Sequence, residues 1–360
     1  MANKLKPLIL GDLELKVPII QGGMGVAIST ASLASAVANY GAAGTIASVG
    51  LGYQSNENMS NFVKASREGL QKEIRNAKQL SKGVIGANIL VAVSNYDDLV
   101  KVVVEEKADF IVSGAGLPLK LPEVTQGSSV KLIPIVSSPR ATTIIIKTWK
   151  RRYNRIPDAI VVEGPMAGGH LGFDLDQLNK MEENKLEDLV AEVLKVVNDF
   201  EKEFKTKIPV IAAGGIFTGT DVAKFFKLGV SGVQIATRFV ATHECTVPEK
   251  FKKLYLEAKD EDVVIIKSPV GMPGRAIKTA LIKRVVEGGR EPVICNYRCL
   301  RTCDPATVPY CIAKALFNAV KGNIDDSVVF AGSNVSRVDK IVSVKELLDE
   351  IVNEAQQALD

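Results

Sequence analysis

Two turns that follow successive apolar strands have the residue types expected of an anion site. Small residues directly follow each of the runs Ile208–Ala213 and Gly232–Ile235, and a helix begins shortly after the first turn. Glycine leaves backbone N–H groups open to an oxygen-rich anion, and a helix start adds a favourable dipole. Two such turns in this order predict a phosphate site, although ordinary tight turns would use the same glycines. The residues concerned are Gly214, Gly215, Ala236 and Thr237.

A histidine in a glycine-rich loop is the candidate for acid–base chemistry. The loop follows the apolar run Ala159–Val162 and carries His170, one of two histidines in the chain. Histidine titrates near neutrality, so His170 could move a proton or hydrogen-bond a developing anion. A lone loop histidine is more often an ordinary surface residue, but the flanking glycines and the strand-end position favour function. His243 has no such setting and is interpreted as structural.

Two further strand ends carry groups that could face a flat ligand. Gly22, Gly23 and Met24 follow the first apolar run, where glycines permit close backbone approach and methionine offers a soft apolar surface. Asn88 ends another run with an amide that both donates and accepts hydrogen bonds. Each of these signals would also arise from an ordinary turn.

Four of the five cysteines fall within residues 295–311. In a helix the first three would share one face. Four thiolates could hold an iron–sulfur cluster or a zinc ion, but the spacing matches neither the common ferredoxin runs nor paired CxxC motifs. Packed or redox-active thiols are the favoured interpretation, and no metal ligand is assigned. The residues are Cys295, Cys299, Cys303 and Cys311.

Three basic residues, Arg275, Lys278 and Lys283, lie in the later part of the chain. Solvated surface side chains are the favoured interpretation of this group. The alternative is that they receive an anionic substrate or the phosphate of a pyridine nucleotide.

Eight short apolar runs alternate with longer amphipathic segments. The runs show no polar alternation, as expected of parallel strands buried on both faces. Eight strand–helix units predict a closed TIM (β/α)₈ barrel, with a doubly wound open sheet as the alternative. The expected strands are Pro18–Gln21, Ala43–Ile46, Val84–Asn88, Phe110–Ser113, Leu132–Val136, Ala159–Val162, Val210–Ala213 and Gly232–Ile235. The expected helices are Thr30–Tyr40, Asn56–Ser81, Asp97–Lys107, Pro139–Arg152, Leu186–Lys205 and Thr220–Leu228.

The alternation of predicted strands and helices stops near residue 240, and this divides the chain into three parts. Residues 1–240 form the predicted barrel, and residues 241–340, which are richer in turns, predict a mostly helical cap near its mouth. Residues 341–360 carry Leu347, Leu348 and Ile351 at helical spacing. They predict an amphipathic helix that packs back on the barrel.

Composition narrows the classes of partner. The net charge is +4, from 45 basic and 41 acidic residues, and only 6% of residues are aromatic. With no basic stripe, nucleic acid is not expected. No apolar run reaches the roughly 20 residues of a membrane span, and the N-terminus lacks a signal peptide, so a cytoplasmic protein without a membrane partner is expected. A small-molecule substrate is the expected partner. Cap helices often mediate dimers, so a homodimer is considered and the oligomeric state stays open.

Six segments together resemble one family, in order and with fitting spacing from about residue 8 to residue 280. The chain is similar to the nitronate monooxygenase (2-nitropropane dioxygenase) family, which includes the FMN-dependent enoyl-acyl-carrier-protein reductase of type II. The resemblance implies a TIM barrel with non-covalent FMN. The segments are PIIQGGMG (18–25), GANIL (86–90), IVSGAGLP (111–118), VEGPMAGGHLG (162–172), IPVIAAGGI (208–216) and GVQIATRF (232–239).

The resemblance also implies roles for individual residues. His170 would be catalytic, beside the flavin. Met24 and Asn88 would contact the isoalloxazine ring, and Gln234 would reach the ribityl chain or the phosphate. The phosphate would be bound by Gly214, Gly215, Ala236 and Thr237. The remaining expected flavin-site residues are Gly22, Gly23, Ser137 and Gly169.

Several reactions are compatible with such a site. Oxidation of alkyl nitronates with O₂ is the first expectation, because the family pattern supports it most broadly. An NAD(P)H-dependent enoyl-thioester reductase and an NAD(P)H:quinone reductase are redox alternatives, and both would use NAD(P)H as co-substrate. A phosphate-binding barrel lyase or isomerase is the non-redox alternative. It would want a strand-end lysine or carboxylate, and Glu163 is the only such acid beside His170.

Overall fold

Eight parallel strands form the centre of the protein, whose computed structural model describes residues 5–52, 62–295 and 298–360. The strands follow the order β3-β11-β10-β8-β7-β6-β5-β4, and every neighbouring pair is parallel. The outermost strands meet where Gln21 N donates to Ala43 O (2.9 Å) and Ala43 N donates to Ile19 O (3.0 Å). The predicted closed barrel is therefore confirmed. The strands are β3 (Ile19–Gln21), β4 (Gly44–Ala47), β5 (Ile85–Leu90), β6 (Phe110–Gly114), β7 (Lys131–Val136), β8 (Ile160–Glu163), β10 (Val210–Ala213) and β11 (Gly232–Ile235).

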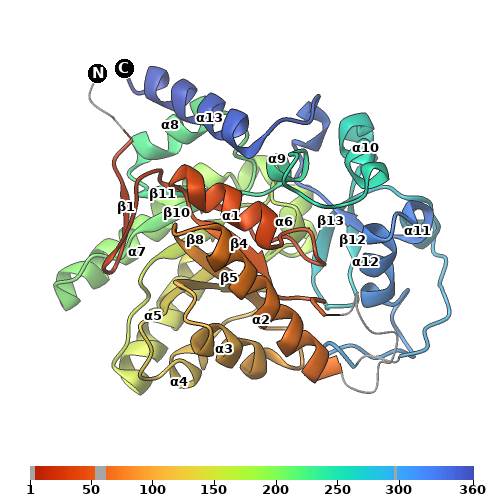
Figure 1. Cartoon of the computed structure of the whole chain (residues 1–360), viewed down its shortest axis with the longest axis horizontal. Helices are drawn as coiled ribbons and strands as arrows, with labels where there is room; N and C mark the ends of the chain where they lie inside the picture. Colours follow the sequence, from red (N-terminus) through yellow and green to blue (C-terminus); the bar gives the residue numbers. More distant parts are fainter. Residues whose placement is uncertain (1–4, 53–61, 296–297) are drawn as a thin grey trace.

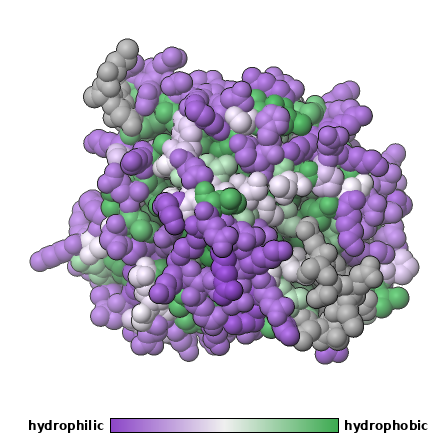
Figure 2. Space-filling model, viewed as in Figure 1, coloured by the Kyte–Doolittle hydropathy of each residue, from purple (hydrophilic) through white to green (hydrophobic). Residues whose placement is uncertain are grey.

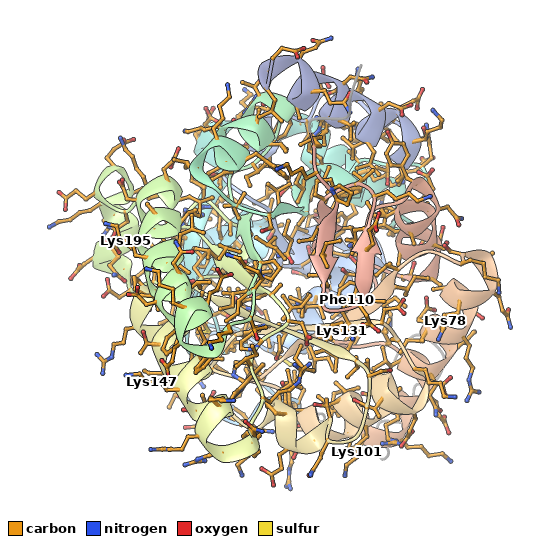
Figure 3. The ribbon with its side chains drawn as sticks, turned by 90° about the vertical axis from the view of Figure 1, so that its left-hand side faces the viewer. Lys78, Lys101, Phe110, Lys131, Lys147 and Lys195 are labelled. Atoms are coloured by element: carbon orange, nitrogen blue, oxygen red, sulfur yellow. The ribbon has the colours of Figure 1, made fainter. Side chains whose placement is uncertain are left out.

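Helices surround the barrel and shield its strands from water (Figure 1). Their buried faces are apolar, and lysines such as Lys78, Lys101, Lys147 and Lys195 project outward (Figure 3). All eight predicted strands and all six predicted helices occur, although the start of the helix predicted from Asn56 lies outside the described residues. The helices are α1 (Ala31–Tyr40), α2 (Phe62–Leu80), α3 (Tyr96–Glu105), α5 (Pro139–Tyr153), α7 (Leu186–Phe204) and α8 (Gly219–Leu228), with the shorter α4 (Leu121–Val124), α6 (Leu175–Asn179) and α9 (Thr237–Val240).

A hairpin that was not predicted closes the N-terminal end of the barrel. It consists of β1 (Leu8–Leu10) and β2 (Leu13–Leu15), whose buried leucines pack against the barrel interior beside Phe110. Lys131, at the start of β7, forms an ion pair with Asp12 in the hairpin turn, and Figure 3 shows Phe110 and Lys131 beside the hairpin. With this end filled by apolar side chains, ligand access is left to the opposite, C-terminal end.

The cap after β11 contains both helices and an antiparallel sheet. The helices are α10 (Glu249–Glu257), α11 (Ala280–Val286) and α12 (Ile312–Val320). The sheet consists of β12 (Val263–Lys267), β13 (Pro273–Ile277) and β14 (Val329–Phe330) and was not predicted. A two-residue strand from the barrel, β9 (Gly169–His170), pairs with β13. The cap therefore holds the glycine-rich loop that carries the histidine.

The C-terminal helix α13 (Val344–Ala358) packs against α8 and α1 (Figure 1). Its buried face carries Leu347, Leu348 and Ile351. Gly219 permits the close approach of α8, since a Cβ there would lie 2.2 Å from Ile351 O. Tyr40 Oη donates to Asp349 Oδ1 (2.6 Å), which attaches the helix to α1.

The outer surface is mostly hydrophilic on the face drawn in Figure 2, with small scattered apolar patches. Within the described residues, no helix combines the length and the apolar character that crossing a membrane would require.

Candidate functional site

A cavity opens where the C-terminal ends of the barrel strands meet the cap. The barrel contributes residues that lie in or directly after β3, β4, β5, β6, β7, β8 and β11. The cap contributes Tyr255, Leu316, Phe330, Ala331 and Gly332. Nine of the predicted site residues line this cavity, which is the expected position of a TIM-barrel active site. They are Gly22, Gly23, Met24, Asn88, Gly169, His170, Gln234, Ala236 and Thr237.

The loop after β3 lies directly on the end of β5. A Cβ on Gly23 would lie 2.3 Å from Asn88 Cβ, so only glycine permits the present position of the asparagine. The neighbouring Gln21 is fully buried, where its Oε1 accepts from Thr45 N (3.0 Å) and its Nε2 donates to Ser29 Oγ (2.8 Å). These bonds fix the loop that carries Met24, and both Met24 and Asn88 line the cavity.

The predicted anion turns line a compartment that adjoins the main cavity. Gly214 and Gly215 have φ angles of 90° and 85°, a left-handed conformation that favours glycine. Asn334 Nδ2 donates to Gly215 O (2.7 Å), and Thr237 Oγ1 accepts from Gly332 N (3.0 Å). The cap therefore fixes both turns. The compartment shares Glu163, Gly168, Gln234, Ala236, Thr237 and Gly332 with the main cavity.

Two polar side chains lie in the wall shared by these spaces. Gln234 Oε1 is buried and accepts no hydrogen bond within the described structure. A buried acceptor without a donor is costly, so this atom favours a ligand that supplies a hydrogen-bond donor. Glu163, at the end of β8, has its pKa raised by burial to about 7, so near neutrality it can donate as well as accept.

His170 is positioned jointly by the barrel loop and the cap. Its Nε2 lies 2.8 Å from Ser268 Oγ, and its ring meets Phe330 edge to face at a centroid distance of 4.9 Å. Ser268 Oγ also accepts from Val270 N (3.3 Å). Burial lowers the pKa of His170 to about 4, so the imidazole is neutral at physiological pH.

Arg275 is buried rather than solvated, which makes its sequence-based interpretation wrong. Its side chain is 3% exposed, and its guanidinium donates to the carbonyl oxygens of Pro165 and Ala167 (2.7 Å to the latter). Strand β13 places Arg275 opposite Gly169, directly behind the histidine loop. The arginine therefore shapes the loop and does not receive a substrate.

A second, largely apolar compartment extends from His170 toward α2, α3 and α12. Val49, Leu90 and Leu316 line both this space and the main cavity. Two of its polar side chains, Ser48 and Asn95, are 0% and 3% exposed, and their Oγ and Nδ2 atoms have no hydrogen-bond partner within the described structure. The space therefore suits an apolar ligand that carries a hydrogen-bonding group.

One predicted residue lies outside the cavity, and three site residues were not predicted. Ser137 follows β7 and does not line the cavity; a Cβ on Gly172 would lie 2.6 Å from its Oγ. Ser268, Ser48 and Asn95 were missed because their significance depends on contacts between distant segments. A serine beside Pro269 and Gly271 gives no sequence signal that it will meet a histidine 98 residues earlier.

Comparison with known proteins identifies relatives along nearly the whole chain. A family model described as nitronate monooxygenase matches residues 6–354. A (3aS,4S,5R,7aS)-5-hydroxy-7a-methyl-1-oxo-octahydro-1H-indene-4-carboxyl-CoA dehydrogenase of Mycobacterium tuberculosis is 25% identical, with 94% of this chain and 92% of the relative covered. A "probable nitronate monooxygenase" of Staphylococcus aureus is 27% identical over 76% of this chain and 78% of the relative.

Solved structures show the same architecture. FabK from Thermotoga maritima is 28% identical, has a TM-score of 0.73 and covers 96% of this chain and 94% of its own. A nitroalkane oxidase from Streptomyces ansochromogenes has a TM-score of 0.73 at 18% identity, covering 96% and 97% of the two chains. The latter likeness supports the fold alone.

Proposed function

The chain belongs to the nitronate monooxygenase family, and from this premise we propose that it binds FMN at the barrel mouth and oxidises alkyl nitronates with O₂. It is an enzyme of the oxidoreductase class. The observation that carries the proposal is a single neutral histidine, His170, at the junction of the cavity at the barrel mouth and a second, apolar compartment.

The residues present suit FMN in three separate ways. Gly22 and Gly23 have no side chains, so a flat ring could lie against their backbone beside Asn88. The Asn88 amide could hydrogen-bond to the polar edge of the isoalloxazine. The unpartnered Gln234 Oε1 can accept from a ribityl hydroxyl. The left-handed glycine turn at Gly214 and Gly215 would hold the phosphate together with Ala236 and Thr237. Bound FMN would supply the redox chemistry, while the protein supplies orientation and electrostatics.

The hydrogen bond between His170 and Ser268 supports a role for the histidine. Ser268 Oγ accepts from Val270 N, and in our proposal it donates its own proton to His170 Nε2, which lies 2.8 Å away. The neutral imidazole would then carry its proton on Nδ1 and donate it to an anionic nitro oxygen. A neutral nitroalkane would need the other tautomer to lose its α-proton, so this arrangement supports the preformed nitronate as substrate.

Anaerobic spectroscopy of the purified protein tests this proposal. Flavin absorption should be present, and propyl nitronate should bleach it whereas NADH should not. The His170→Ala variant should keep the flavin bands and lose the bleaching. A colourless protein that takes up no added FMN would contradict the cofactor assignment. Bleaching of wild type by NADH alone would contradict the monooxygenase assignment.

An NAD(P)H-dependent reductase of an enoyl thioester is the second candidate, and the apolar compartment favours it. That space extends away from His170 between α2, α3 and α12, so it could hold a chain longer than a small nitronate. A relative named as a carboxyl-CoA dehydrogenase matches 94% of this chain. Turnover of crotonyl-CoA with NADH or NADPH, in the absence of nitronate activity, would replace the first proposal with this one.

A further inference from the structure

Four cysteines gather in the cap, outside the main cavity. Cys295, Cys299 and Cys303 follow α11 and lie outside helices and strands, and Cys311 immediately precedes α12. None of these three residues lies in a helix, so the helical face considered from the spacing does not arise. Cys245 is the fifth cysteine and lies apart from this group, with its Sγ 3.8 Å from Ile28 O.

The backbone brings the four thiols within electrostatic reach of one another. The segment is fixed to the β5–α3 loop, where Ser94 N donates to Cys299 O (2.9 Å) and Arg301 N donates to Ala92 O (3.0 Å). Cys299 lies close enough to the other three thiols to interact with each of them, and Cys303 interacts with Cys295 and Cys311.

The surroundings include two features that favour negatively charged sulfur. Arg298 N donates to Cys295 Sγ (3.4 Å), as backbone amides do to the sulfurs of metal clusters. Cys311 occupies the N-cap position of the nine-residue helix α12, where the positive end of the helix dipole lies close to a negatively charged ligand set.

We propose that Cys295, Cys299, Cys303 and Cys311 ligate an iron–sulfur cluster. Four thiolates per cluster is the usual ligand set. A single tetrahedral zinc ion needs every sulfur about 2.3 Å from the metal. Within the described part of the chain, no group of three His, Cys, Asp or Glu side chains has an arrangement that could hold one ion. A four-iron cluster accepts a more widely spaced set, because each thiolate binds a different iron.

The position of this site gives it a relation to the catalytic cavity. Cys299 and the adjacent Leu300 line the apolar compartment that also contains His170. The cluster would therefore border the substrate compartment. Because its ligands are separate from the proposed flavin residues, the two sites can be tested independently.

Metal analysis of anaerobically purified protein, reconstituted with ferrous iron and sulfide, tests the proposal. Wild type should contain about four irons and four acid-labile sulfides per chain. After reduction with dithionite it should show a low-temperature electron paramagnetic resonance signal distinct from that of a flavin radical. One zinc per chain and no iron would overturn the cluster, as would four titratable thiols with no bound metal.

Matched serine variants locate the ligands. Cys299→Ser and Cys303→Ser should each lose most of the iron, whereas Cys245→Ser should retain it. Circular dichroism would check that each variant is folded, and Cys303→Ser provides a more exposed position should Cys299→Ser fail to fold. Full iron content in both folded ligand variants would overturn the assignment.

Discussion

Ser268 Oγ lies 2.8 Å from His170 Nε2, and this contact joins the cap to the loop that follows β8. The two residues are 98 positions apart, and the pairing of β9 with β13 brings them together. The cap therefore helps to orient the proposed catalytic histidine.

Replacing Ser268 by alanine should impair the reaction without removing the cofactor. Loss of one hydrogen bond to the imidazole is worth about 1 kcal/mol, which corresponds to a fall of roughly fivefold in kcat. Steady-state kinetics on propyl nitronate and the flavin content would be measured together. Ser333→Ala is a matched cap variant, since Ser333 bonds only to Met166 O and not to His170. Equal kcat in Ser268→Ala and wild type would exclude the tautomer role.

Glu163 should make the free energy of unfolding of flavin-free protein depend on pH. Burial raises its pKa from 4.5 to about 7, so between these values the folded protein binds more protons than the unfolded chain. Its contribution to stability is therefore complete below about pH 4.5 and is lost as the pH rises through about 7. Urea unfolding of wild type and Glu163→Gln across this range should show a smaller decline in the variant. If the free energy of unfolding changed equally with pH in both proteins, the raised pKa of Glu163 would be refuted.

His170 should contribute to stability in the opposite direction. Burial lowers its pKa from 6.5 to about 4, so the unfolded chain binds the extra proton first. Its neutral form stabilises the fold above about pH 6.5, and that contribution is lost as the pH falls through about 4. Unfolding curves of His170→Gln should lose this acid-side slope. Nuclear magnetic resonance titration of the imidazole, giving a midpoint near 6.5, would contradict the expectation.

Alanine at position 23 should weaken flavin binding. Its Cβ would lie 2.3 Å from Asn88 Cβ, and relieving the overlap must displace the asparagine or the loop. Overpacking of this kind costs about 1–3 kcal/mol, so FMN affinity should fall by roughly tenfold to a hundredfold. Gly25→Ala is the control, because the nearest atom to its Cβ, in Val49, is at an ordinary 3.4 Å. Equal dissociation constants for the two variants, measured by fluorescence titration, would contradict the prediction.

Removal of the Arg275 side chain should destabilise the protein. The variant Arg275→Ala leaves the carbonyl oxygens of Pro165 and Ala167 without their donor, at a cost of about 3 kcal/mol. A fall in Tm of several degrees is expected for a chain of this size. Lys278→Ala serves as the control, since that exposed side chain bonds only to Glu261 O. A Tm within a degree of the control would show that the loop does not depend on the arginine.

The alternation of apolar runs and amphipathic segments was enough to predict the barrel. Each strand, such as Val210–Ala213, is a short apolar run because a parallel strand is covered on both faces. The cap sheet escaped prediction because β14 is only two residues long and pairs with β13 across more than fifty residues of chain. The hairpin β1–β2 was missed for a related reason, since three-residue strands give little periodicity.

The sequence by itself determined the fold class and the nine predicted residues that line the cavity at the strand ends. The C-terminal ends of all strands in a parallel barrel lie on one face. Glycine, histidine and amide residues at those strand ends must therefore lie close together. The tertiary structure alone decided that Ser268 would meet His170, that Arg275 would be buried behind the same loop, and that four cysteines would approach one another without a helix. These relationships depend on how the cap folds over the barrel, and pairing between segments so distant along the chain leaves no local pattern in the sequence.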